Sequence, residues 1–215
     1  MYIYTNRWLN NPNVAKEVAL KTKYPSNFFK LIFLVILLTV LYAPGAFADV
    51  YKLDPVHTSI IFRVKHLGVS YFYGRFNGAS GTFSFDEAAP SKSFIEMRVS
   101  TNNIDTDVEK RDNHLKSPDF LDAQKHPLIK FQSNSVTQVA TDNYEIKGDL
   151  MLLGKTRPLT IKAVHTGSGQ DPWGNFRSGF KTSFIINRSD FGMDFMLGGV
   201  SDEVQLTVSI EGIKQ

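Results

Sequence analysis

Apolar side chains recur at every second position over most of this 215-residue chain. In one typical segment, Phe62 and Val64 alternate with Arg63 and Lys65. A period of two places alternate side chains on opposite faces of a β-strand, whereas a helix requires a period near 3.6. The pattern predicts eight or nine strands with one apolar face each, over residues 60–66, 72–76, 82–86, 95–99, 128–136, 144–152, 158–165, 176–186 and 204–211.

Strands with one apolar face must bury that face, which limits the fold to two arrangements. Their sheet either packs on a second sheet or closes on itself. A closed barrel of about eight strands has an interior just large enough for side chains or one small ligand. Gly74, Gly78 and Gly81 favour the barrel, because glycine bends allow long strands to curve. We expect an all-β fold, an eight-stranded antiparallel barrel and not a flat sandwich.

Two segments interrupt the alternation. Residues 105–116 are dense in charge, Asp107 is a candidate helix cap, and Ser117-Pro118 is a second candidate helix start. We therefore expect a short helical insertion near residues 106–122, capping one mouth of the barrel. Residues 187–192 are interpreted as a turn held by an Arg–Asp pair, or alternatively as part of a polar rim at that mouth.

The first 48 residues contain the successive parts of a secretory signal peptide. Lys21, Lys23 and Lys30 precede an apolar run over residues 31–43, and a small-x-small cleavage pattern ends at Ala48. A membrane-spanning helix needs about 20 apolar residues, so this run is short for an anchor. We expect a leader over residues 1–48, cleaved after Ala48, and a barrel domain over residues 49–215. An uncleaved anchor and a buried core helix are the alternatives.

Charge and cysteine content exclude several classes of function. The leader holds five of the 24 Lys and Arg residues and one of the 21 Asp and Glu residues, so 19 basic and 20 acidic residues remain in the barrel domain. That domain has no concentrated basic stripe, which argues against a nucleic-acid partner. The chain has no cysteine, which excludes disulfides, thiol nucleophiles and cysteine-ligated zinc.

No local motif for catalysis or metal binding is present. The five histidines show neither H-x-H nor H-E-x-x-H spacing, and G-x-S-x-G is absent. We expect no metal and no cofactor. An enzyme on this scaffold, the alternative, would use His114 or His57 as general base with Asp112 or Asp119 as its partner. A solvated helix with locally paired charges explains the same residues without chemistry.

Phenylalanine is the most informative residue type, with 17 in the chain, several of them on the apolar rows. Such rows usually form a filled core. The same rings would line a dry tunnel if the barrel were hollow. Alternation is therefore compatible with two hypotheses for the barrel: a solid structural or partner-binding module, and a hollow carrier.

Five motifs in order resemble the YceI-like family, and the resemblance covers essentially residues 50–213. They lie at residues 57–68, 111–122, 148–158, 187–192 and 202–204. The resemblance implies an extended, lipocalin-like antiparallel barrel of eight strands. It also implies an exported, periplasmic protein whose tunnel holds an isoprenoid chain, such as a polyprenyl phosphate or a quinone tail.

Such a carrier needs an apolar tube and a polar mouth, but no catalytic group. Burying ten methylene groups contributes roughly 8 kcal/mol before association costs. We expect these inward-facing side chains to contact the tail: Phe62, Val64, Phe76, Phe83, Phe85, Leu150, Leu152, Phe184 and Leu206. His66, Arg111 and His114 are candidate donors to a phosphate or quinone head group. An imperfectly closed barrel edge would favour a homodimer.

Overall fold

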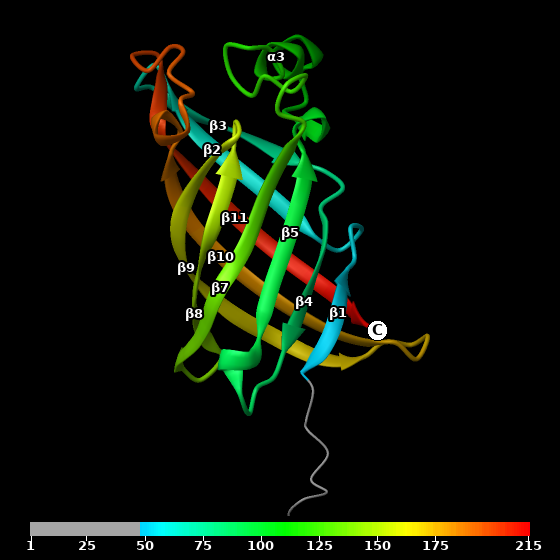
Figure 1. Ribbon diagram of the computed structural model, residues 1–215. Helices are drawn as coiled ribbons and strands as arrows, with labels where there is room; N and C mark the ends of the chain where they lie inside the picture. The colour runs from blue at the N-terminus through cyan, green and yellow to red at the C-terminus, as the bar shows by residue number, and fades with distance from the viewer. Residues whose placement is uncertain (1–47) are drawn as a thin grey trace, which may run out of the picture. The chain divides into compact units, whose positions relative to one another are not determined.

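Eleven β-strands and one short α-helix make up residues 48–215, the part of the chain that the computed structural model describes (Figure 1). In chain order the elements are β1 (Asp49–Leu53), β2 (Ser59–His66), β3 (Ser70–Phe76), β4 (Ser80–Phe85), β5 (Phe94–Ser100), β6 (Ile104–Asp105), α3 (Glu109–Leu115), β7 (Leu128–Ala140), β8 (Asn143–Leu152), β9 (Lys155–Gln170), β10 (Phe176–Asn187) and β11 (Val200–Lys214). These residues form a structural unit of their own. The predicted leader and signal peptide, residues 1–48, lies outside the described residues except for Ala48.

The strands form one closed antiparallel barrel, as the alternation predicted. Around the ring the order is β1, β4, β5, β7, β8, β9, β10 and β11, and β11 pairs back with β1. The remaining strands, β2, β3 and β6, continue β1, β4 and β5 along the barrel wall. Thus β11 pairs with β1 near Lys214 and with β2 nearer its start, β3 pairs with β2, and β6 pairs with β3. Eight long strands therefore enclose the interior, three of them interrupted.

Glycines explain where one of these long strands bends. Gly78, between β3 and β4, has a φ of 68°, and Gly81 has a φ of 150°. A β-carbon on Gly81 would collide with the Glu96 carbonyl oxygen of β5. These two positions agree with the predicted bends. Gly74 does not bend the strand: it stays in register opposite Phe62, and its missing side chain leaves room for the Phe62 ring.

The helical insertion is shorter than the sequence predicted. Only α3 is helical, and residues 116–122 form turns and bends because they are tied by single backbone hydrogen bonds. Asp107 is not the cap: it has a left-handed φ of 63°, and Val108 occupies the N-cap position. Phe120 and Leu121 are buried in the core, which anchors the insertion at one end of the barrel (Figure 1).

Strand boundaries differ from the predicted ones mainly at the turns. The alternation missed the short strands β1 and β6. The strand predicted over residues 158–165 is longer in the structure, because backbone pairing with β10 extends β9 to Gln170. The β8–β9 turn is Leu153-Gly154, with φ values of 52° and 69°, which is the backbone of a tight hairpin turn.

The interior contains two apolar clusters, a larger one that includes Phe120 beside α3 and Tyr144 on β8, and a smaller one that includes Tyr51 on β1 and Ile210 on β11. Phe76, Phe180, Phe184 and Leu206 pack against both clusters but are only partly buried. Side chains that face inward yet keep accessible surface border an open space. Among the described residues, no helix has both the length and the apolar character needed to cross a membrane.

Candidate functional site

An apolar cavity of about 370 Å³ lies inside the barrel. This volume is in the range of small-molecule sites in proteins, about 300–1,000 Å³. Its wall is built from the inward-facing side chains of nearly every long strand and from the insertion around α3. The barrel is therefore hollow, which argues against the solid-module alternative.

All nine side chains predicted to contact a tail lie in the cavity wall: Phe62, Val64, Phe76, Phe83, Phe85, Leu150, Leu152, Phe184 and Leu206. The alternation placed them correctly because residues two apart on a strand share a face. The same rule identifies wall residues that the prediction omitted, such as Ile60, Phe131 and Phe180. Their contact with a guest stays a prediction.

Aromatic rings close the cavity at the end away from α3. Phe180 lies at the centre of this group, with its ring centroid 4.9 Å from Phe85, 5.6 Å from Phe83 and 4.9 Å from His165. Tyr144 packs edge-on against Phe85 at 5.4 Å. Perpendicular packing of this kind is favourable for aromatic pairs. Phe83 and Phe85 thus serve two purposes, since they face the cavity and also seal it.

His165 is the polar member of this seal, and no sequence motif singles it out. Its Nε2 atom lies 3.0 Å from the Ser168 hydroxyl and 3.2 Å from the buried Ser178 hydroxyl. The two hydroxyls also bond to each other, with Ser168 donating at 2.9 Å. These bonds pair the Nε2 atom of His165 and the buried Ser178 hydroxyl within the aromatic seal.

The mouth near α3 carries a cation in the cavity wall. Arg111 donates from Nε to the Thr106 hydroxyl at 2.8 Å and from Nη2 to the Thr106 carbonyl at 2.5 Å. Its guanidinium lies over the Phe72 ring. Asp112 is occupied elsewhere, accepting from the Thr106 backbone N–H and hydroxyl. Among residues 48–215, no carboxylate pairs with Arg111, so its charge is available to a head group.

The other two head-group candidates also line the cavity, but in different settings. His114 Nε2 lies 2.9 Å from Asp119 Oδ2, and the ring packs edge-on against Phe120 and Phe195. His66 is exposed at the end of β2. His66, Arg111 and His114 thus all border the cavity, and their role in binding a head group stays a prediction.

The residues of the enzyme hypothesis do not form one site. His57 bonds to Asp54 at 2.8 Å, on a different part of the barrel from the His114–Asp119 pair. Of the two predicted partners, Asp119 bonds to His114 at 2.9 Å, whereas Asp112 accepts from Thr106 and has no histidine partner among residues 48–215. Within the described part of the chain, neither His57 nor His114 is hydrogen-bonded to a hydroxyl that it would activate.

Arg188 organises the loop that precedes β11. The residue is 2% exposed and donates four hydrogen bonds of 2.8–2.9 Å, all to backbone carbonyl oxygens of Met193, Phe195, Val200 and Ser201. Burial lowers the pKa of the Arg188 guanidinium. The predicted Arg–Asp pair is therefore wrong: the turn is held by an arginine bonded to carbonyls. Arg188 also lines the cavity, so this clamp shapes its mouth.

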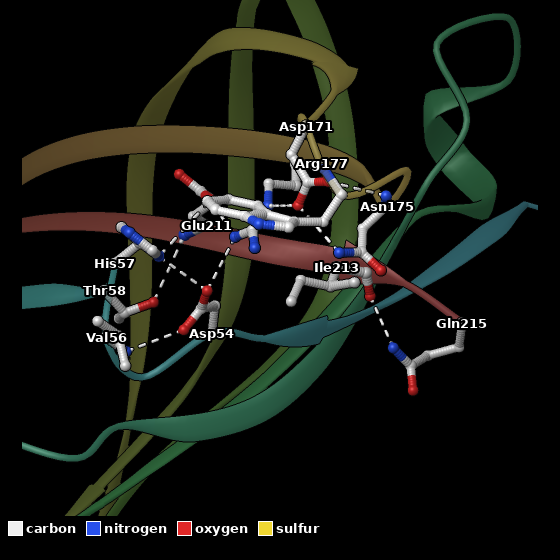
Figure 2. Close-up of polar contacts among 11 residues, drawn as sticks. Asp54, Val56, His57, Thr58, Asp171, Asn175, Arg177, Glu211, Ile213 and Gln215 are labelled. Atoms are coloured by element: carbon white, nitrogen blue, oxygen red, sulfur yellow. Dashed lines mark hydrogen bonds and ion pairs between the residues drawn. The ribbon is translucent and has the colours of Figure 1, made fainter.

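A second polar cluster lies near the end of β11, outside the cavity (Figure 2). Arg177 bonds to Asp171 at 2.7 Å, to Asp54 at 2.8 Å and to Glu211 at 2.5 Å. Hydrogen bonds from His57 and then Arg177 hold the pKa of the Asp54 carboxyl well below its usual range. Asp171, Asp54 and Glu211 in turn raise the pKa of Arg177. The cluster joins β10, β11 and the loop after β1.

This cluster also contains the one group of metal-ligand type among the described residues. Asp54, His57 and Glu211 offer ligand atoms that all lie within 4.8 Å of one another. Arg177 already bonds to both carboxylates, so the positive charge that a metal would supply is present as a guanidinium. The cluster is better explained as an ion-pair network than as a metal centre.

Comparison with known proteins gives a consistent family assignment. The model of the YceI-like domain family matches residues 51–212. A UPF0312 protein of Pseudomonas aeruginosa is 46% identical over 175 residues, covering 80% of this chain and 91% of that protein. A UPF0312 protein of Shewanella denitrificans is 47% identical over 159 residues, covering 74% and 83% respectively.

Solved structures share the barrel at lower sequence identity. Burkholderia cenocepacia BcnA superposes with a TM-score of 0.68 at 21% identity, covering 74% of this chain and 98% of that chain. A polyisoprenoid binding domain from Saccharophagus degradans, implicated in plant cell wall breakdown, gives a TM-score of 0.59 at 12% identity and covers 77% and 98%. At these identities the likeness shows a common fold.

Proposed function

Because this chain belongs to the YceI-like domain family and its barrel encloses an apolar cavity, we propose that it is an exported, periplasmic protein that binds and carries an isoprenoid chain. The guest would be a polyprenyl phosphate or a quinone, with its tail in the cavity and its head at the α3 mouth. A protein of the same fold, from Saccharophagus degradans, is a polyisoprenoid binding domain, which supports this choice of guest.

The observation that carries the proposal is the dry lining of the cavity. Its wall consists almost entirely of aliphatic and phenyl groups, from Phe62 on β2 round to Leu206 on β11. Burial of a hydrocarbon chain contributes about 0.8 kcal/mol per methylene group. Two isoprene units, about ten carbons, would contribute roughly 8 kcal/mol, which corresponds to micromolar binding before association costs.

The polar groups at the mouth supply orientation for the guest. Within residues 48–215, Arg111 adds a cation without a carboxylate partner to the cavity wall, and His66 and His114 also belong to that wall. A phosphate or a quinone carbonyl accepts hydrogen bonds from such donors. The opposite end is sealed by aromatic rings, so the guest enters tail-first.

Export is supported by the leader sequence. Lys21, Lys23 and Lys30, the apolar run and the cleavage pattern ending at Ala48 stand before the first strand, which begins at Asp49. Fractionation of cells and N-terminal sequencing of the recovered protein test this part directly. A mature protein beginning at Asp49 in the periplasmic fraction is the expected result, and a full-length chain held in the membrane fraction would refute it.

Native mass spectrometry of the protein isolated from its host's periplasm tests the binding function. Two neighbouring residues of β11 provide a matched pair of variants, since Leu206 lines the cavity and Thr207 is exposed on the outer face. Leu206→Trp should reduce retained prenyl lipid by about tenfold, equivalent to roughly 1.4 kcal/mol of lost burial. Thr207→Trp should retain as much as the unchanged protein. A barrel that returns empty and takes up no prenyl lipid would overturn the proposal.

A further inference from the structure

The barrel mouth has an exposed apolar edge formed by the β2–β3 hairpin and the loop before β11. The tip of the β2–β3 hairpin presents Leu67, 60% exposed, and Val69, 85% exposed. The loop before β11 presents Phe195, Met196 and Leu197, which are 38–46% exposed. We call these five residues the mouth rim. Exposed apolar side chains gathered at one place usually mark an interaction site.

The two halves of the mouth rim are in contact. The backbone N–H of Leu67 donates to the Gly199 carbonyl at 2.6 Å. A β-carbon on Gly199 would lie 2.9 Å from the Met196 methyl and 3.5 Å from a Leu67 methyl, so these two side chains border one another there. Figure 1 shows the β2–β3 hairpin and the loop before β11 at the same end of the barrel. The rim is therefore one surface built from two segments distant in sequence.

This surface continues into the cavity. Met196 is 46% exposed and also belongs to the cavity wall, as do His66 and Val200 beside it. The apolar side chains of Met196 and Val200 therefore connect the exposed rim to the apolar interior. A planar apolar surface that contacted the mouth rim would therefore lie over the opening of the cavity.

The charge of the hairpin indicates which partner covers the rim. Residues 59–76 contain Arg63, Lys65 and Arg75 and no acidic residue, whereas the loop half of the rim carries the exposed Asp190 and Asp194. The basic hairpin is therefore the half that would face anionic groups. Tyr71 and Tyr73 are exposed on the same outer face, and the Arg63 guanidinium lies 4.5 Å from the centroid of the Tyr71 ring. Tyrosines and basic side chains behind an apolar tip are the composition of segments that insert at a lipid–water interface.

We propose that the mouth rim docks the barrel on the surface of an anionic lipid bilayer. Leu67, Val69 and Leu197 would enter the interfacial region, while Lys65 and Arg63 would lie at the level of the lipid phosphates. Anionic lipids attract juxtamembrane basic residues, and the apolar tip adds burial. Docking concerns the outer surface and needs no guest in the cavity. Its test is therefore independent of the proposed isoprenoid binding.

Flotation with vesicles free of prenyl lipid tests this docking. Residues 49–215, which contain every strand of the barrel, are mixed with vesicles of phosphatidylglycerol and phosphatidylethanolamine, or of phosphatidylcholine alone. The protein should float with the anionic vesicles and much less with the neutral ones. Lys65→Gln should weaken binding to the anionic vesicles about fivefold.

A matched pair of double variants separates the mouth rim from general surface hydrophobicity. Leu67→Asn with Val69→Thr removes apolar surface and keeps the backbone, because asparagine tolerates the left-handed φ of 50° at position 67. This variant should bind anionic vesicles about tenfold less tightly. Val56→Thr with Val139→Thr removes exposed valines elsewhere and should change binding less than about twofold. Equal losses for both pairs would overturn the proposal, as would unchanged binding of the rim variant.

Tryptophan fluorescence gives an independent measure of orientation. Trp173 is the only tryptophan in residues 49–215 and is 81% exposed in the β9–β10 turn, away from the mouth. Its emission should not shift when anionic vesicles are added. Val69→Trp in a Trp173→Phe background should shift to the blue. A blue shift of Trp173 itself would show docking by the opposite end and would refute the assignment.

Discussion

The guanidinium carbon of Arg111 lies 5.1 Å from the centroid of the Phe72 ring, at the mouth of the cavity. Thr106 holds the other side of the same guanidinium through two hydrogen bonds. The ring and the threonine together keep a positive charge at the junction between apolar wall and solvent. The geometry predicts a preference for a guest whose head is anionic.

Arg111→Met should weaken the binding of a polyprenyl phosphate about tenfold, because charge-assisted hydrogen bonds contribute roughly 1.5–3 kcal/mol. The affinity for the corresponding uncharged prenol should stay nearly the same. Competition binding with the two lipids measures the difference. Lys110→Met, an exposed neighbour in α3, serves as the control and should affect neither lipid. Equal losses for phosphate and prenol would contradict a head-group role for Arg111.

Phe180→Ala should open the sealed end of the cavity. Deletion of a large core ring costs about 3 kcal/mol of unfolding free energy, measurable by urea denaturation. The deeper cavity should also accept longer chains, which native mass spectrometry of the retained lipids would reveal. Phe176→Ala on the same strand, where the ring is exposed, should cost about 1 kcal/mol or less. An unchanged chain-length distribution would mean that Phe180 does not limit the cavity.

Arg188→Met should destabilise the protein by about 3 kcal/mol, since four backbone carbonyls lose a charged donor in a buried place. Hydrogen exchange should rise in residues 193–200 before it rises in the strands. Arg157→Met removes an exposed arginine that donates to the Asp190 carbonyl and should cost less than about 0.5 kcal/mol. Similar losses of unfolding free energy in the two variants would show that Arg188 does not hold the loop before β11.

Stability should fall in acid through the Asp54–Arg177 network. The pKa of Asp54 is lower in the folded protein than in the unfolded chain, first because of His57 and then because of Arg177. Such a carboxylate stabilises the fold above its unfolded pKa of about 3.9 and loses that contribution as the pH falls through the folded value. The free energy of unfolding should therefore decrease below about pH 4.

Arg177→Met tests the network by comparing urea unfolding at neutral and acid pH. The variant should be less stable at neutral pH and should lose less further stability in acid, because its carboxylates no longer have that partner. Arg75→Met breaks a longer, exposed contact of 3.9 Å with Asp105 and serves as the control. A pH dependence as steep in Arg177→Met as in the unchanged protein would place the acid-sensitive groups elsewhere.

Much of the barrel was predictable because strand periodicity is local. Phe62, Val64 and Leu206 could be assigned to the interior from alternation, since a strand turns successive side chains to opposite faces. The charged insertion was predictable from its missing alternation. Its helix was overestimated because Phe120 and Leu121, buried by the barrel, hold the chain in turns.

The polar contacts were less predictable because they join distant segments. Arg177 meets Asp54 across 123 positions of sequence, and no local motif records that pair. Arg188 was expected to bond a neighbouring aspartate and instead bonds carbonyls of a loop that folds around it. The mouth rim arises in the same way, from a hairpin and a loop that β2–β11 pairing brings together.

The sequence by itself determined which side chains face inward and that the fold is all-β. Only the tertiary structure decided that the interior is hollow. The rings of Phe83, Phe85 and Phe180 gather at one end, so the remaining apolar side chains line a space that they do not fill. Whether inward-facing rings meet or stay apart depends on strand pairing and barrel closure, which a period of two residues does not specify.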